Sequence, residues 1–292
     1  MKVFTEKEGA LLKSKEASDG KLSLFSLTWP IFLEFFLFML MGLADTFMLS
    51  AVSDNAVAGV GTANQYIQIA ILLLGVVGIG ASIIVAQYIG AKKLVDATKI
   101  AALSVSLNLI TGFVMSALFL IFSGKIMKMM NLKGEVLEFA QSYLAIVGGF
   151  LFLQAIITTV AAIVRVRGWT KQAMYVSLGM NVLHVILNYV LIFGKFGFPE
   201  MGVEGAAWSS VISRAAAAIV FLWLLTHALE VKVQVKNFLT WSTNYVKKIL
   251  LIGVPSAFEQ ILYQTSQIVL LYYVTHVGAE ALTARQYAMN IS

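Results

Sequence analysis

Long apolar runs, separated by short polar segments, dominate the pattern along the chain. About 20 apolar residues are enough for a helix to cross a bilayer, and the runs predict seven such spans and the start of an eighth near residue 279. The second run is longer than a straight crossing needs and contains Gly75, Gly78 and Gly80, so we expect it to tilt or kink. The predicted spans are 24–50, 56–89, 96–123, 135–164, 172–193, 203–228 and 246–276.

The composition supports the same class of protein. Apolar residues make up 59% of the 292 residues and charged residues only 12%, whereas soluble domains carry about 25% charged residues. We therefore expect an all-α polytopic membrane protein. The chain has no cysteine, which excludes disulfides and Cys-based metal centres. Its three histidines are scattered along the sequence and form no cluster of metal ligands. We expect no metal and no cofactor.

The distribution of Lys and Arg predicts the orientation in the membrane. Residues 1–21 are rich in lysine and lack an apolar core, which indicates a cytosolic tail rather than a signal peptide. With this tail inside, the inner side carries 15 Lys and Arg residues and the opposite side four. Because cytoplasmic loops are enriched in these residues, we predict a multi-pass protein of the cell membrane with a cytoplasmic N-terminus. The net charge of +6 then indicates contact with the lipid bilayer and no nucleic-acid partner.

Two acids interrupt the first predicted span. Asp45 lies within the apolar stretch from Leu24 to Leu49, where a carboxylate near mid-membrane costs roughly 2.5–3.5 kcal/mol and is usually functional. Glu34 comes eleven residues earlier, so both acids share one helix face, about 16 Å apart along the axis. Two acids on one face of a membrane helix indicate a pathway for an ion, a proton or a substrate. The alternative is a structural carboxylate that neighbouring hydroxyls hold.

A weak internal repeat relates the first and seventh spans. Pro30 and Pro255 lie 225 residues apart, and a glutamate follows each by four residues, as Glu34 and Glu259. Six spans separate the two copies, so both start from the same side, as in the parallel repeats of some secondary transporters. The second copy is short, and we expect a fragment of a longer protein. The predicted domains are a tail at 1–21, a six-helix lobe at 22–228, a cytosolic linker at 229–245 and a truncated, pseudo-symmetric second lobe at 246–292.

Six motifs occur in order over residues 22–292: Pro30 with Gly42-Leu-Ala-Asp45-Thr46, then 58–65, 80–92, Arg165-Val-Arg167-Gly168, 181–193 and 202–210. Together they resemble the multidrug and toxic compound extrusion (MATE) transporters. The resemblance implies two six-helix lobes that form a V around a central cavity, which agrees with the repeat. It further implies a monomer, when complete, that exchanges H⁺ or Na⁺ for organic, cationic or amphipathic compounds by alternating access.

The resemblance also implies an ion site. In the family, an acid on the first helix, an Asn and an Asp on the fifth and a hydroxyl on the sixth form a cation or proton site. These positions correspond to Asp45, His184, Asn188 and Ser210. The sequence supports this independently, because Asn181, His184 and Asn188 follow the spacing i, i+3, i+7 and so form one polar stripe on an apolar helix. We expect the Asp45 carboxylate within about 6 Å of His184 or Asn188, where charges interact strongly.

The chain departs from the family pattern at two of these positions. His184 replaces the expected Asn and Asn188 replaces the expected Asp, so the site has one carboxylate. A neutral imidazole is a poor sodium ligand, whereas a histidine beside a carboxylate can relay protons. We therefore favour H⁺ over Na⁺ as the coupling ion. The alternative is that His184 only hydrogen-bonds a neighbouring helix.

Further polar residues are candidates for the wall of a substrate cavity. The two symmetry-related glutamates could attract a cation at the inner mouth, or they could pair with basic loops. The uncharged candidates could instead connect helices. Arg214 lies within the sixth span and needs a counter-charge, while Arg165 and Arg167 are interpreted as topology and headgroup contacts. The cavity candidates are Glu34, Asn64, Gln65, Gln68, Asn181, Glu259, Tyr263 and Gln267.

The sequence disfavours three other classes of function. A flippase for lipid-linked oligosaccharides shares this general architecture, but its cavity should carry several arginines, and only Arg214 and Arg285 lie within predicted spans. An intramembrane enzyme would need a nucleophile–base or metal cluster, and an ATPase would need a Gly-x-x-x-x-Gly-Lys-Ser/Thr loop. The sequence shows neither. The expected partners are a small organic substrate and a coupling cation.

Overall fold

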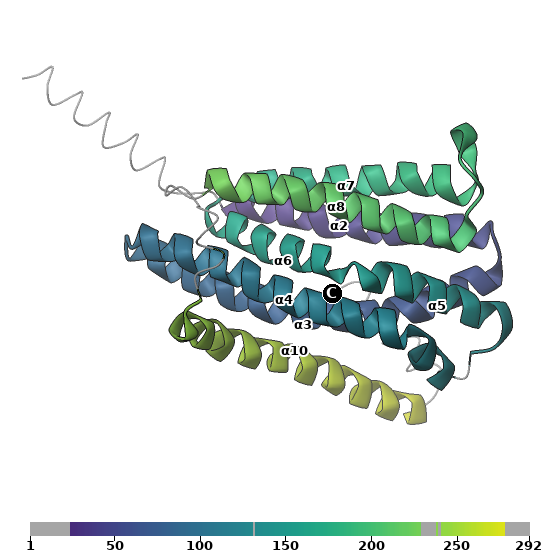
Figure 1. Ribbon diagram of the computed structural model, residues 1–292. Coiled ribbons are helices and arrows are strands. Elements are labelled where there is room, and N and C mark those ends of the chain that lie inside the picture. The colour runs from purple at the N-terminus through teal and green to yellow at the C-terminus, as the bar shows by residue number, and fades with distance from the viewer. Residues whose placement is uncertain (1–23, 131, 229–237, 239–240, 278–292) are drawn as a thin grey trace, which may run out of the picture.

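The computed structural model describes residues 24–130, 132–228, 238 and 241–277, and this part of the chain is helical with short connections (Figure 1). The predicted eighth span and the tail at 1–21 lie outside the described residues. The elements are α2 (Leu24–Ser50), α3 (Asp54–Gly90), α4 (Leu94–Met129), α5 (Gly134–Gly149), α6 (Leu151–Val166), α7 (Thr170–Ile192), η1 (Lys195–Gly197), α8 (Gly202–Ala228) and α10 (Thr243–Val277).

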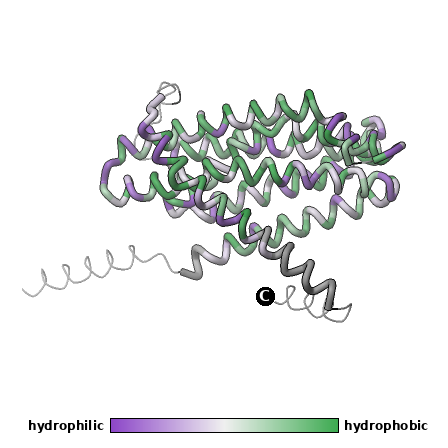
Figure 2. Tube along the Cα trace, turned by 90° about the horizontal axis from the view of Figure 1, so that it is seen from below, coloured by the Kyte–Doolittle hydropathy of each residue, from purple (hydrophilic) through white to green (hydrophobic). Residues whose placement is uncertain are grey.

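The helices confirm the all-α, polytopic class. Among the described residues, five helices are long and apolar enough to cross a membrane, or six if the bent pair α5 and α6 forms one span. Figure 2 shows apolar residues along the length of the bundle, with hydrophilic residues gathered mainly toward its two ends. This is the distribution that a bilayer requires, because its interior offers no water to polar groups.

The main bend lies in the predicted fourth span and not in the second. The predicted second span is α3, a continuous helix of 37 residues. The predicted fourth span is two helices, α5 and α6, bent by 50° at their junction near Phe150. Gly148 and Gly149 precede the bend and lie against α4, where an added Cβ atom would come within 2.8 Å of Phe119 and 2.7 Å of Leu120. The two glycines therefore allow α5 to approach α4 closely.

The helices lie side by side, and α2 is the most weakly covered of the five helices that could each span a membrane. Figure 1 shows α7, α8 and α2 together along one side of the bundle, with α5 and α6 between them and α3 and α4. α2 packs mainly against α7, and much of its apolar surface is exposed, including Phe35 and Phe47. Polar contacts are therefore important for fixing α2 to the bundle.

The last described helix, α10, packs against α3 at the opposite side of the bundle (Figure 1). Two glycines make this approach possible. A Cβ atom on Gly80 would collide with the carbonyl of Ile249, and one on Gly253 would collide with the carbonyl of Val76. That α10 opens a second lobe remains a prediction.

Candidate ion and substrate site

Asp45 and the polar stripe of α7 meet between α2 and α7. The Nε2 atom of His184 lies 2.9 Å from Oδ1 of Asp45, and Nδ2 of Asn188 donates to the same oxygen at 2.6 Å. Both distances are well below the 6 Å expected from the sequence. His184 is 2% exposed and Asn188 is fully buried. The polar stripe of α7 thus faces the interior of the bundle, where the Asp45 carboxylate of α2 lies against it.

The second ring nitrogen of His184 faces α8. Its Nδ1 atom lies 3.5 Å from Oγ of Ser213. The Ser213 hydroxyl donates to the carbonyl of Ser209 at 2.7 Å, so its oxygen keeps lone pairs that can accept a hydrogen bond. Sequence reasoning named Ser210 and missed Ser213. The sequence feature that could have pointed to Ser213 is its spacing of four residues from Ser209, which places the two hydroxyls one turn apart on the same helix.

A second group of polar residues adjoins this site. Tyr143 of α5 is buried, with its hydroxyl within hydrogen-bonding reach of the Ser210 and Asn64 side chains. Arg214 of α8 interacts electrostatically with Tyr143 and Asp45, but no ion pair joins it to Asp45 among the described residues, so its counter-charge stays open. Tyr143 was missed from the sequence, since one tyrosine in an apolar span carries no distinguishing pattern. Five helices thus contribute to one polar network, in which Asp45 and Asn64 are partly exposed and the other side chains are buried or nearly so.

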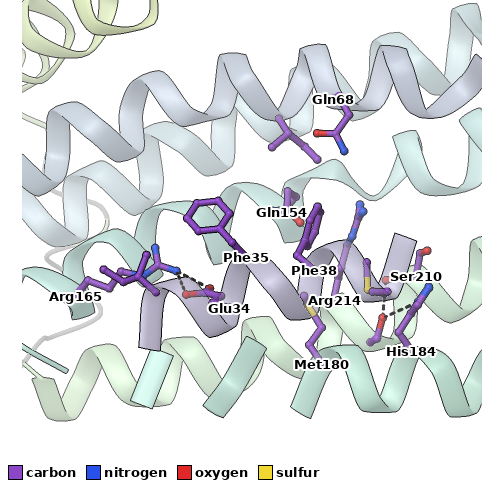
Figure 3. Close-up of a pocket in the computed structure, with 14 residues that line it drawn as sticks. Glu34, Phe35, Phe38, Gln68, Gln154, Arg165, Met180, His184, Ser210 and Arg214 are labelled. Atoms are coloured by element: carbon purple, nitrogen blue, oxygen red, sulfur yellow. Dashed lines mark hydrogen bonds and ion pairs between the residues drawn. The ribbon is translucent and has the colours of Figure 1, made fainter. Parts of the chain in front are cut away.

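A cavity of about 550 Å³ lies beside this network. Figure 3 shows the rings of Phe35 and Phe38 between the two polar ends, with Gln68 and Gln154 on one side and Met180 on the other. Large, adaptable side chains of this kind suit organic molecules of varied shape. The cavity is lined by Ile31, Glu34, Phe35, Phe38, Met41, Gln68, Ile71, Gln154, Arg165, Met180, His184, Ser210, Ser213 and Arg214.

Glu34 closes one end of the cavity in a salt bridge. The Nη2 atom of Arg165 donates to both carboxylate oxygens, at 2.6 and 2.8 Å (Figure 3). The Ser177 hydroxyl donates to one of them at 2.7 Å. The negative charge of Glu34 is therefore balanced within the chain, which favours the pairing interpretation over attraction of a cation. The interpretation of Arg165 as a topology or headgroup contact is wrong, because this side chain binds Glu34 and lines the cavity.

The other cavity candidates are divided among several places. Gln68 lines the cavity, while Asn64 belongs to the network around Tyr143. Asn181 is buried against a separate groove between α2 and α7. Among the described residues, the cavity lining does not include Gln65, Glu259 and Tyr263, which are exposed; the Gln267 side chain lies outside the described residues.

Comparison with known proteins decides the family. The MatE family model matches residues 30–190, which is more than half of the chain. The chain belongs to the MatE family. Among curated MatE relatives, it is 38% identical to the uncharacterized transporter YisQ of Bacillus subtilis over 95% of this chain and 61% of that protein. It is 31% identical to a probable multidrug resistance protein NorM of Thermotoga maritima, over 96% of this chain and 60% of that protein.

Solved MatE-type structures share the fold. A transporter of the MOP superfamily from Pyrococcus furiosus, described as having a binding pocket of reverse polarity, matches with a TM-score of 0.78 and 25% identity. The match covers 91% of this chain and 58% of that one. A MATE crystal structure in complex with MaD3S matches with a TM-score of 0.79 and 25% identity, over 91% of this chain and 59% of that one.

Two consequences follow from membership of the MatE family. The family consists of membrane transporters and not of enzymes, and the flippase alternative is not favoured. The chain spans about 60% of the length of the curated MatE relatives that it matches. The site described above lies within that part, on α2, α7 and α8.

Proposed function

We propose that this chain forms the first lobe, and the start of the second lobe, of a proton-coupled antiporter that exports organic compounds by alternating access. The observation that carries the proposal is the Asp45–His184 pair, 2.9 Å apart, with His184 on the wall of a 550 Å³ cavity. An acid and an imidazole inside a membrane are the groups expected of a proton relay.

The surroundings of His184 suit a ring that gains and loses a proton. When both ring nitrogens carry hydrogen, Nε2–H donates to the Asp45 carboxylate and Nδ1–H faces the Ser213 oxygen. A carboxylate only accepts, and the Ser213 hydrogen already serves the Ser209 carbonyl. The charged ring therefore meets an acceptor at each nitrogen without rearrangement of its neighbours.

The same atoms make the pair a poor site for sodium. The hydrogen-bond partners of Oδ1 of Asp45 are Nε2 of His184 and Nδ2 of Asn188, both nitrogens. A hard cation such as Na⁺ requires several oxygen ligands. This supports H⁺ as the coupling ion.

Exchange follows from the position of the pair at the cavity wall. A proton on His184 adds a positive charge beside the space that a substrate occupies, and like charges repel strongly where water is scarce. A substrate with a positive group and the proton then exclude one another, which is the condition for antiport. In this proposal the N-terminus is cytoplasmic and the complete transporter acts as a monomer in the bilayer.

The test is transport by inside-out vesicles that contain this chain extended by a second lobe. Substrate uptake should follow an imposed pH gradient at constant sodium. A sodium gradient at constant pH should have no effect. Uptake that responds only to sodium would contradict the proposal.

A further inference from the structure

A groove of about 320 Å³ lies between α2 and α7, apart from the cavity described above. Its rim residues Leu40, Val182 and Ile186 are exposed, and α10 packs at the opposite side of the bundle (Figure 1). The groove therefore opens toward the bilayer. Met41 lines both the groove and the larger cavity, and the other lining residues belong to the groove alone. The groove is lined by Leu37, Leu40, Met41, Ala44, Leu178, Asn181, Val182, Val185 and Ile186.

Asn181 gives this apolar groove one polar group. The residue is 6% exposed, and its Oδ1 atom has no hydrogen-bond partner in the described part of the chain. The two residues that continue the polar stripe of α7, His184 and Asn188, bind Asp45 instead. A buried amide oxygen without a partner is costly in apolar surroundings. The groove thus offers a hydrogen-bond acceptor to a molecule that brings a donor.

The depth of Asn181 restricts where that donor can come from. Asn181 is the central residue of α7, as Leu37 is of α2. The hydrocarbon core of a bilayer is about 30 Å thick, which places lipid headgroups about 15 Å from its middle. A bound water needs two to four polar partners, and the other lining residues are apolar. The donor must therefore belong to a molecule that lies within the hydrocarbon.

We propose that the groove between α2 and α7 binds a small, neutral, apolar molecule with one hydroxyl group, which enters from the bilayer and donates to Oδ1 of Asn181. The molecule is neutral because no charged residue lines the groove, and an unbalanced charge at mid-membrane is costly. The volume of the groove lies at the lower end of the range for ligand pockets, which sets the size of the molecule. This proposal does not depend on the proposed antiport.

The test uses two photoaffinity probes that differ in one group. The first is 4-hexylphenol with a diazirine in its alkyl chain, and the second is the methyl ether of the same compound, which cannot donate a hydrogen bond. The chain in lipid nanodiscs is irradiated with each probe at equal concentration in the lipid, and mass spectrometry locates the labelled residues. The phenol should label residues 37–44 and 178–186 about three to ten times as strongly as the ether, the ratio expected of one hydrogen bond.

The Asn181→Leu variant replaces the amide with an apolar group of similar size. Labelling of the groove by the phenol should fall to the level of the ether. Labelling by the ether should stay the same, which also shows that the groove remains folded. Gln172→Leu is the matched control and should keep the wild-type ratio, because Gln172 is exposed on the same helix and does not line the groove.

Four results would overturn the proposal. The first is equal labelling of the groove by phenol and ether in the wild type, and the second is a preference for the phenol that persists in Asn181→Leu. The third is a preference confined to Phe35 and Phe38, which would assign the hydroxyl to the larger cavity. The fourth is loss of groove labelling when the chain is extended by a second lobe, which would show that protein covers the groove.

Discussion

Nε2 of His184 lies 2.9 Å from Oδ1 of Asp45, although 139 residues separate the two in the chain. The contact joins the weakly covered α2 to the stripe of α7 and places a titratable pair beside the cavity. A second acid, Glu34, fixes the same helix to Arg165 and Ser177. α2 is thus attached to the bundle through both of its carboxylates.

Ser213 should help His184 to hold its proton. Ser213→Ala removes the acceptor that faces Nδ1, and the 3.5 Å separation indicates a contact weaker than a full charged hydrogen bond. We expect proton-driven uptake to require about fivefold more protons for its half-maximal rate, measured as a shift of the pH profile toward acid. Ser209→Ala is the matched control, because its hydroxyl bonds only within α8, to the carbonyl of Gly205. Equal profiles for the two variants would exclude the role of Ser213.

Glu34 should contribute to stability through Arg165. Glu34→Gln leaves the Arg165 charge without its partner, and we expect the midpoint of thermal unfolding in detergent to fall by several degrees. The loss should correspond to about 1–2 kcal/mol, less than for a fully buried pair, because both side chains are partly exposed. Glu34→Gln combined with Arg165→Gln should recover part of the loss. The exposed Glu138→Gln serves as the control; a similar fall in both variants would contradict the pairing.

Gly80 should be required for the docking of α10. An alanine there would place its Cβ against the Ile249 carbonyl, so α10 must move away from α3. We expect Gly80→Ala to lower the thermal midpoint clearly. Gly75→Ala on the same helix meets no atom within 4 Å and should leave the midpoint unchanged or raise it. A tolerated Gly80→Ala would show that α3 and α10 do not cross this closely.

The fold could be predicted from the sequence to a large extent, since the length of an apolar run decides where a helix crosses a bilayer. The predicted span 24–50 has the bounds of α2, and 203–228 differs from α8 by one residue. The bend near Phe150 was missed because Gly148 and Gly149 lie within a continuous apolar run and act through contacts with α4. The hydropathy of a segment contains no information on its contacts with other helices.

The candidate site could be predicted in part. The spacing of His184 and Asn188 places both on one helix face, and the resemblance pointed to Asp45. The Glu34–Arg165 pair joins residues 131 positions apart, and only the packing of α2, α6 and α7 brings them together. The spacing of Ser209 and Ser213 marks a polar face of α8, but it does not show that this face meets α7, so Ser213 was missed.

The most direct test of proton coupling is uphill transport by Asp45→Asn in proteoliposomes, with this chain extended by a second lobe. Asparagine keeps the shape and an acceptor oxygen for Asn188, but it removes the charge that balances protonated His184. We predict that an imposed pH gradient no longer concentrates substrate, while downhill movement persists. The exposed Asp54→Asn should behave like the wild type. Accumulation of substrate by Asp45→Asn at the wild-type ratio would contradict the account.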